Sequence, residues 1–488
     1  MILSVDIGTS SVKVALTDLE GSVVRWVSQP VETLTPEPGA AEHDLEVLYQ
    51  ALLRGMKSVV KGYESDVEAI TFSCYLHGIA LLNREKRAVT RVFTHLDTRA
   101  GRYQNTVENY GRRLYLRTGC PPLFVYPLVK LLWLRERLGL SGRYYVTFVK
   151  DYLIHRLTGL TVLDYGTASG TGLMNIHSLR WDDLALELAG VDESSLPELT
   201  EGASVVERVS IPELNLERVA LVPGSFDGAL QNIGYSAYGE EAVLNLGSTA
   251  VIRTLRSEVI TDRDPRMRFF CYYAADRYRA IGAASNNGMS SLEWVRENIL
   301  GGVDWSTLVD EVSKIRPCSD GVLVLPFIGG ERFPYRDPYL RFTLLGPAVS
   351  HGRAHVARAS LEGVAFILKA IVDALEENGV IVRTLHCGGG GCNIGSLVRV
   401  VADTCCKPVV VYGGDVARLA SSIGAAAVAV RALGYSARLD AVKFDCVSRS
   451  RLDTVVPDVS TCSVYRECFS RFSEVLSSVS DIYRKLLC

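Results

Sequence analysis

Several features that would assign this chain to a specialised class of protein are absent from its 488 residues. No stretch of about 18 uninterrupted apolar residues is present, and the first residues carry no basic segment, so we expect a cytoplasmic protein without a membrane span or leader peptide. The net charge of -3 is spread along the chain without a basic stripe. We therefore expect neither a membrane nor a nucleic acid as partner.

Paired cysteine motifs are missing too. The twelve cysteines are scattered along the chain, form no CxxC pair and have no histidine partners at zinc-binding spacing. This pattern favours small buried side chains over a disulfide framework or a metal site. Arginine outnumbers lysine, which fits either genome composition or a warm habitat. Since intracellular disulfides are more common in warm habitats, that alternative stays open.

The chain does contain ample material for large hydrophobic cores, with 48% hydrophobic and 22% charged residues. Its length exceeds what one core usually organises, which favours two domains of roughly 200 residues or more. We place one domain at residues 1–235 and the other at residues 236–488, the second ending in a helical tail.

A strand, turn, strand pattern occurs twice, about 240 residues apart. In the first copy, apolar strands are predicted at residues 2–5, 12–17 and 23–27. In the second copy, strands at residues 242–246 and 250–255 flank an equally tight turn. The repetition predicts two similar α/β halves that face each other across a cleft.

Helical periodicity is clear at three places. The patterns at residues 128–138 and 182–189 are predicted to be helical insertions in the first half. Apolar residues recur at three- and four-residue steps over residues 359–378, and Gly379 follows where a left-handed cap belongs. We expect this last helix to face a core.

Both turns of the repeat are rich in glycine and hydroxyl residues. Glycine lets backbone N–H groups approach an anion, hydroxyls donate to phosphate oxygens, and the carboxylate of Asp6 can hold hydrated Mg²⁺. One such turn is equally typical of a polar hairpin, but two facing copies can clamp a polyphosphate from both domains. The candidate phosphate-binding residues are Gly8, Thr9, Ser10, Ser11, Lys13, Gly247, Ser248 and Thr249.

Four consecutive glycines, residues 388–391, follow a predicted strand at 380–387 and precede a predicted helix at 396–404. Either close approach to a nucleotide or a flexible turn explains them, and their position favours the nucleotide. A run of small residues at 421–427 is expected to let a helix pack close to the same sheet. The candidate nucleotide-binding residues are Gly288, Gly389, Gly390, Gly391 and Asn393.

Asp227 follows an apolar strand and lies just before the second half begins. An Asp-Gly pair is ordinarily a turn. A carboxylate at the domain junction, opposite a γ-phosphate, is nevertheless what deprotonation of an acceptor hydroxyl requires. We therefore take Asp227 as the candidate general base and Asp6 as the second catalytic candidate, positioning Mg²⁺.

Polar side chains flank a hairpin predicted over residues 79–94. Leu76 and His77 precede it, and Asp97 and Arg99 follow it. Each of these residues alone is commonly structural. Together they form a set that can bind the hydroxyls of a polyol, so we take them, with Asp227, as the substrate-binding candidates.

In this order the motifs resemble the FGGY carbohydrate kinases, the family of xylulokinase, gluconokinase and glycerol kinase, over residues 2 to about 434. Leu76-His77-Gly78 is similar to the family's Met-His-Gly sugar contact and Asp97 to Arg99 to its Asp-x-Arg. Residues 330–334 resemble a Gly-Glu-Arg-x-Pro signature, and residues 388–391 the adenosine loop. The resemblance implies two actin- and hexokinase-like (ribonuclease H-like) α/β domains with a cleft between them, the first binding sugar and phosphate and the second the nucleotide.

The resemblance leans towards gluconokinases at residues 225–234, 285–288 and 127–134. It implies ATP- and Mg²⁺-dependent phosphorylation of a hydroxyl of a sugar or sugar acid, with gluconate first and xylulose or another pentulose or polyol second. A sugar acid would need a cation such as Arg99 or Arg332, unless each is held in a structural ion pair. The alternative class is a non-catalytic actin-like ATP-binding protein. A homodimer is left open.

Overall fold

The computed structural model, which describes residues 1–139 and 144–487, contains two large mixed sheets. The first belongs to the N-terminal half and has the strand order β13-β14-β5-β1-β2-β3. Its central strands are buried on both faces, as parallel pairing usually requires. The strands are β1 (Ile2–Ile7), β2 (Ser11–Thr17), β3 (Val23–Pro30), β5 (Ala69–Cys74), β13 (Glu207–Ile211) and β14 (Leu216–Phe226).

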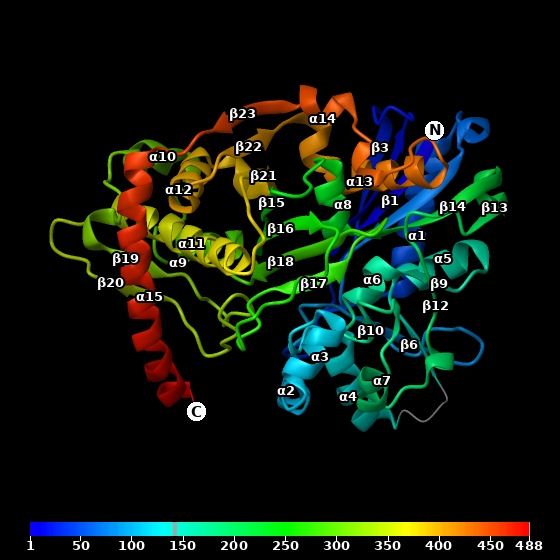
Figure 1. Cartoon of the computed structure of the whole chain (residues 1–488), viewed down its shortest axis with the longest axis horizontal. Helices are drawn as coiled ribbons and strands as arrows, with labels where there is room; N and C mark the ends of the chain where they lie inside the picture. The colour runs from blue at the N-terminus through cyan, green and yellow to red at the C-terminus, as the bar shows by residue number, and fades with distance from the viewer. Residues whose placement is uncertain (140–143, 488) are drawn as a thin grey trace.

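The second sheet belongs to the C-terminal half and has the order β17-β18-β16-β15-β21-β22-β23. Figure 1 shows it beside the first sheet, with the C-terminal helix α15 (Val459–Leu487) on the side of the molecule away from the first sheet. Its strands are β15 (Glu241–Leu246), β16 (Ala250–Arg256), β17 (Phe270–Tyr273), β18 (Arg279–Ser285), β21 (Thr384–Gly388), β22 (Val409–Tyr412) and β23 (Arg451–Val455).

The two sheets repeat one topology. In the first, β2 pairs antiparallel with both β1 and β3, while β5 pairs parallel with β1 and with β14. In the second, β16 pairs antiparallel with β15 and β18, while β21 pairs parallel with β15 and β22. The two similar α/β halves predicted from the repeated pattern are therefore confirmed.

Two helices join the halves. The chain leaves the first sheet into α8 (Asp227–Gly234), and α13 (Gly414–Ala432) packs on α8 and on β1, β5 and β14. A Cβ on Gly234 would lie 2.0 Å from the carbonyl oxygen of Ala420, and one on Gly424 would lie 1.8 Å from that of Leu230. The run of small residues was predicted to let a helix pack close to the second sheet. Instead, it lets the backbone of α13 contact the backbone of α8, and α13 packs on the first sheet.

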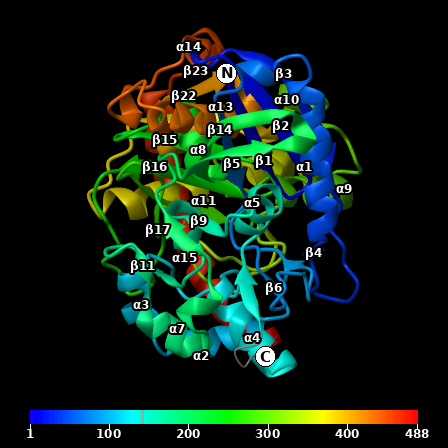
Figure 2. The same ribbon diagram turned by 90° about the vertical axis from the view of Figure 1, so that its right-hand side faces the viewer.

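The predicted helices are present with shifted ends. The pattern at 359–378 lies in α11 (Arg353–Glu376), the one at 128–138 is α4 (Pro127–Leu138), and the one at 182–189 is α7 (Asp183–Ala189). Figures 1 and 2 show α2, α3, α4 and α7 as a helical cluster below the sheets. The other helices are α1 (Leu45–Val60), α2 (Gln104–Glu108), α3 (Gly111–Thr118), α5 (Lys150–Thr158), α6 (Tyr165–Ser169), α9 (Met289–Asn298), α10 (Trp305–Ser313), α12 (Gly395–Cys405), α14 (Asp445–Arg449) and α15 (Val459–Leu487).

The hairpin predicted over residues 79–94 exists only as isolated antiparallel bridges, Ile79 with Phe93 and Leu82 with Ala88. Its strands pair elsewhere, β6 with β8 and β7 with β4. Short buried strands find partners by tertiary contact, which local sequence does not reveal. The short strands are β4 (Glu42–His43), β6 (Ala80–Leu82), β7 (Val92–Phe93), β8 (Tyr145–Thr147), β9 (Val162–Asp164), β10 (Met174–Asn175), β11 (Arg180–Trp181), β12 (Glu198–Thr200), β19 (Leu323–Leu325) and β20 (Thr343–Leu345).

The cysteines depart from the expectation of unpaired buried thiols. Disulfides join Cys318 to Cys468, Cys387 to Cys392 and Cys406 to Cys462. Two of the three attach α15 to the body of the second half, where a helix at the chain end gains most from a covalent link.

Among the described helices, none combines the length and apolarity that a bilayer crossing needs.

Candidate active site

A cavity of about 480 Å³ lies where the two halves meet, and we call it the junction cavity. The turn between β1 and β2 faces it from the first half, and the turn between β15 and β16 from the second. It brings together predicted residues that are far apart in the sequence. These are Asp6, Gly8, Thr9, Ser10, Ser11, Lys13, Leu76, His77, Asp227, Gly247, Ser248 and Thr249.

The two glycine turns are closed by their own backbone hydrogen bonds. The N–H of Gly8 donates to the carbonyl of Ser11 at 2.9 Å, and the N–H of Gly247 to that of Thr249 at 3.0 Å. Lys13 lies across the strand pair from Asp6, and its Nζ donates to the carbonyl of Arg418 at 3.2 Å. The turns thus present hydroxyls and backbone amides to the cavity from both halves, which suits a polyphosphate.

Asp6 is the last residue but one of β1, all of whose residues are buried, and it is only 8% exposed. The hydroxyl of Ser73 on the neighbouring strand donates to its Oδ1 at 2.6 Å. Burial raises the pKa of Asp6, while Ser73 and Lys13 oppose the shift. The result is an oriented carboxylate at the edge of the sheet, beside the first phosphate turn.

Asp227 is the first residue of α8, and the N–H of Gly228 donates to its Oδ1 at 2.6 Å. Burial and the charge of Asp6 raise the pKa of Asp227 to about 6, against the lowering effect of Arg253, the Gly228 N–H and Lys150. A general base is most effective when its pKa lies near the working pH. This carboxyl group therefore has the position and the proton affinity that acceptor activation requires.

His77 occupies an unusual backbone conformation, with φ of 71°. Its Nδ1 donates to the carbonyl of Gly170 at 2.7 Å, and burial holds the pKa of the ring well below its usual value. The ring is therefore neutral, with Nε2 as an acceptor. His95, which also lines the cavity, has its pKa lowered by burial to about 3. Neutral imidazoles suit hydroxyl groups better than anions.

Aromatic rings that sequence reasoning missed form one end of the junction cavity. The hydroxyls of Tyr126 and Tyr272 lie 2.6 Å apart, and the ring of Phe270 stacks on Tyr272 at 4.2 Å. Phe226, next to Asp227, contacts Tyr272 edge to face. The one available signal was the alternation of Phe270 and Tyr272 along a strand, which places both rings on one face.

Two buried arginines also line the cavity. Arg253 lies on β16 and was not predicted, although a charged residue in an apolar strand is itself a signal. Arg332 donates through Nε to the carbonyl of Ala284 at 2.7 Å and neighbours Tyr126 and Tyr272. Within the described residues, neither guanidinium forms an ion pair with a carboxylate, although the chain carries many such pairs elsewhere.

The structure does not bring Asp97 and Arg99 to the cavity. The guanidinium of Arg99 pairs with Asp97 at 2.5 Å, with Glu42 at 2.5 Å and with Glu37 at 2.6 Å. Asp97 also accepts from the N–H of Ala41 and is 1% exposed. These two side chains thus belong to an ionic network that attaches the segment after β7 to residues 37–42.

The predicted nucleotide residues lie behind the second phosphate turn and not in the wall of the junction cavity. The N–H of Gly288 donates to the carbonyl of Ser248 at 3.2 Å. A Cβ on Gly389 would lie 2.6 Å from the carbonyl oxygen of Leu246, so this loop contacts the end of β15. Gly390, Gly391 and Asn393 continue it as a single helical turn, with Gly390 and Gly391 inside the loop closed by the Cys387–Cys392 disulfide and Asn393 directly after it.

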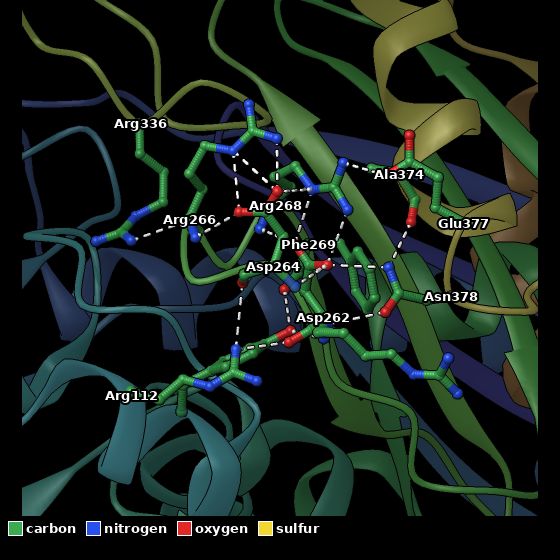
Figure 3. A network of polar contacts seen from close by, with 12 residues as sticks. Arg112, Asp262, Asp264, Arg266, Arg268, Phe269, Arg336, Ala374, Glu377 and Asn378 are labelled. Atoms are coloured by element: carbon green, nitrogen blue, oxygen red, sulfur yellow. Dashed lines mark hydrogen bonds and ion pairs between the residues drawn. The ribbon is translucent and has the colours of Figure 1, made fainter.

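Figure 3 shows a polar network around Asp262 and Asp264, in the segment that precedes β17. Arg112 in α3 donates to the carbonyl of Asp262 at 2.6 Å and to that of Asp264 at 3.2 Å. Arg336 pairs with Glu108 of α2 at 2.7 Å. The helical cluster is thereby attached to the chain segments that carry Phe270, Tyr272 and Arg332.

Comparison with known proteins identifies the family to which the chain belongs. The family model for the N-terminal domain of the FGGY family of carbohydrate kinases matches residues 1–234, and that for the C-terminal domain matches residues 249–433. The chain is 31% identical over 412 residues to the gluconokinase of Bacillus subtilis, covering 80% of each chain. It is 26% identical over 507 residues to the xylulose kinase of Lactococcus lactis, covering 100% of this chain and 98% of that one.

Solved structures agree in fold. The gluconate kinase from Lactobacillus acidophilus superimposes with a TM-score of 0.92 over 99% of both chains, at 24% sequence identity. The predicted pair of actin- and hexokinase-like domains is therefore confirmed, and the enzyme class is a phosphotransferase that uses ATP to phosphorylate an alcohol group. From the two family models and these relatives, the chain belongs to the FGGY family of carbohydrate kinases.

Proposed function

We propose that this carbohydrate kinase phosphorylates a hydroxyl group of a sugar acid, with gluconate as the first acceptor and D-xylulose as the alternative. The observation that carries the proposal is Arg332, a buried guanidinium without an ion-pair partner among the described residues, beside the aromatic end of the junction cavity. An unpaired buried charge is costly, and a carboxylate on the acceptor would relieve that cost.

The sequence offered two arginines, Arg99 and Arg332, as the cation for the acceptor, and their different surroundings distinguish them. Arg99 has three carboxylate partners and does not line the cavity, so the proposal does not assign it to the acceptor. Arg332 has its Nε satisfied by a backbone carbonyl and lines the cavity. Its planar fork suits a carboxylate, which accepts two parallel hydrogen bonds. A neutral pentulose would leave this charge without a counterpart.

The chemistry proposed for the cavity needs one proton transfer and one phosphoryl transfer. Asp227 takes the proton of the acceptor hydroxyl, and that oxygen forms a bond to the γ-phosphorus of ATP as the bond to the β-phosphate oxygen breaks. His77, neutral and with Nε2 as an acceptor, would orient another hydroxyl of the sugar. Gly8 to Ser11, Lys13 and the turn at 247–249 would hold the phosphates.

Mg²⁺ fits the acidic residues of the cavity. Asp6 and Asp227 both line it, and no cluster of three or more metal-binding side chains occurs in the described part of the chain. Mg²⁺ is usually held by one or two carboxylates together with substrate phosphates and water, so this donor set is sufficient. We assign Asp6 to hold the ion, which would supply charge neutralisation at the phosphates.

The glycine loop remains the proposed nucleotide site. Gly288 and Gly389 contact the backbone of the second phosphate turn and of Leu246, which places both segments next to the proposed polyphosphate site. Gly390 and Asn393 form the exposed continuation of that surface, and Gly391 lies buried between them. Backbone so close to the turn supports a nucleotide that extends from the turn at 247–249 towards this loop.

The acceptor is tested by comparing kcat/KM for gluconate, D-xylulose, L-ribulose and glycerol with ATP and Mg²⁺. We expect gluconate to give the highest value. A preference for any neutral acceptor by more than about tenfold, roughly 1.4 kcal/mol in transition-state binding, would reject the sugar-acid assignment and leave the carbohydrate kinase assignment unaffected.

A further inference from the structure

The second unpaired arginine, Arg253, lies at the phosphate end of the junction cavity. It follows Thr249 by four residues on β16, is 5% exposed and lines the cavity together with Asp227 and the second phosphate turn. A Cβ on Gly228 would lie 2.4 Å from its Nη1, so the guanidinium packs over the first turn of α8, one residue from Asp227. The cation thus lies beside the proposed base, in the cavity that the proposed phosphate turns also line.

Its orientation is fixed by neutral groups of α8. Nε donates to Oδ1 of Asn232 at 2.8 Å, and Nη2 lies 3.4 Å from Oε1 of Gln231. The side-chain amide of Asn232 donates back to the carbonyl of Arg253 at 2.8 Å. These contacts hold the plane of the guanidinium without neutralising it, and a hydrogen-bond partner of Nη1 is not found among the described residues.

A role limited to supporting α8 does not explain the charge. A neutral hydrogen-bond donor would be enough to bond the side-chain amides of Asn232 and Gln231. A buried guanidinium without an ion pair, in contrast, carries a desolvation cost. Burial lowers the pKa of Arg253 to about 10, so the group stays cationic near neutral pH. The nearby charge of Asp227 attracts this cation, but none of the described carboxylates forms an ion pair with it. A buried, oriented guanidinium of this kind fits an anion that is present only when substrate is bound.

We propose that Arg253 is a catalytic residue for phosphoryl transfer, whose guanidinium contacts the γ-phosphoryl group as it moves from ATP to the acceptor oxygen. As the bond to the β-phosphate oxygen breaks and the bond to the acceptor oxygen forms, charge accumulates on the transferred group and on the leaving nucleotide. A preorganised cation in a closed site stabilises that charge without having to reorient. The proposal depends on the kinase activity of the family and not on which sugar is the acceptor.

The test compares Arg253→Met and Arg253→Lys with Arg256→Met, a matched control three residues further along the same strand. Arg256 donates to the carbonyl of Ile381 and does not line the junction cavity. With the best acceptor of the panel, we expect Arg253→Met to lower kcat by about 10²–10³-fold. Arg253→Lys should lose less, KM for ATP should change by less than about tenfold, and the control should retain its kcat.

Four further readouts separate catalysis from a structural role. The melting temperature reports folding, and ATP hydrolysis without sugar should fall in the Arg253 variants whichever acceptor the enzyme uses. Because the charge of Arg253 lowers the pKa of Asp227, removing it should move the acidic limb of the pH–rate profile upward. Guanidinium ions should partly restore Arg253→Ala and leave the wild type unchanged.

The proposal is overturned if folded Arg253→Met keeps kcat within about fivefold of the wild type, or if Arg256→Met loses kcat to the same extent. If Arg253→Met does not fold, Arg253→Lys decides, because a full kcat in that variant excludes a need for the guanidinium fork. Failure of gluconate in the acceptor panel changes none of these outcomes.

Discussion

The two ends of the junction cavity are built in different ways. The phosphate end consists of short continuous segments, the turns at 8–11 and 247–249, each closed by its own backbone hydrogen bond. The acceptor end is assembled from His77, Tyr126, Tyr272 and Arg332, which come from separate parts of the chain. With the proposed roles, phosphoryl transfer would depend on local structure that two sheets repeat, and acceptor choice on contacts that only the folded chain creates.

The largest effect should come from the residue where the two ends meet. Asp227→Asn keeps the shape of the side chain but removes the base, so kcat should fall by about 10²–10⁴-fold with little change in ATP affinity. Steady-state kinetics with calorimetric ATP binding measure both. Turnover within a few-fold of the wild type would remove Asp227 from the chemistry.

A change confined to the acceptor end should alter selectivity and leave the phosphate end intact. Arg332→Gln removes a charge-assisted contact of about 1.5–3 kcal/mol, so KM for gluconate should rise by about 10- to 150-fold while KM for D-xylulose stays nearly constant. Arg99→Gln is the matched control, because that arginine is held outside the cavity. Equal losses for both acceptors would show that Arg332 is structural.

A change confined to the phosphate end should alter the dependence on Mg²⁺ and leave the selectivity between acceptors intact. Asp6→Ala removes a carboxylate proposed to hold Mg²⁺, so the Mg²⁺ concentration for half-maximal rate should rise by at least about tenfold, with the ratio of gluconate to xylulose activity unchanged. A titration of activity with Mg²⁺ for both acceptors measures this. An unchanged midpoint would assign Asp6 to structure alone.

The smallest expected effect is that of pH on the wild type. With a pKa of about 6, Asp227 is an ionised base above that pH and protonated below it. The kcat/KM should therefore be constant at neutral pH and decline by about tenfold for each unit below about pH 6. Activity that stays flat down to pH 5 would mean that proton transfer to this carboxyl group does not limit the reaction.

The same contrast explains what could be predicted from the sequence. The strands, both glycine turns and the place of Asp6 and Asp227 in the cavity follow from local patterns, because the same strand, turn, strand pattern occurs twice in the sequence. Arg99 and Arg332 could not be told apart, since the partners Glu37 and Glu42 lie about 60 residues before Arg99. Contacts between residues far apart in the sequence were not predicted. Examples are the hydrogen bond between Tyr126 and Tyr272 and the two disulfides to α15.

The crossing of α8 and α13 has a consequence for how economically the enzyme uses ATP. Gly234 and Gly424 let the two backbones touch, so even one methyl group at either position would push the halves apart. Closure of the halves is what keeps water from competing with the acceptor for the phosphoryl group. The missing side chains at these two positions, neither of which lines the cavity, would thus help to set the yield of sugar phosphate per ATP consumed.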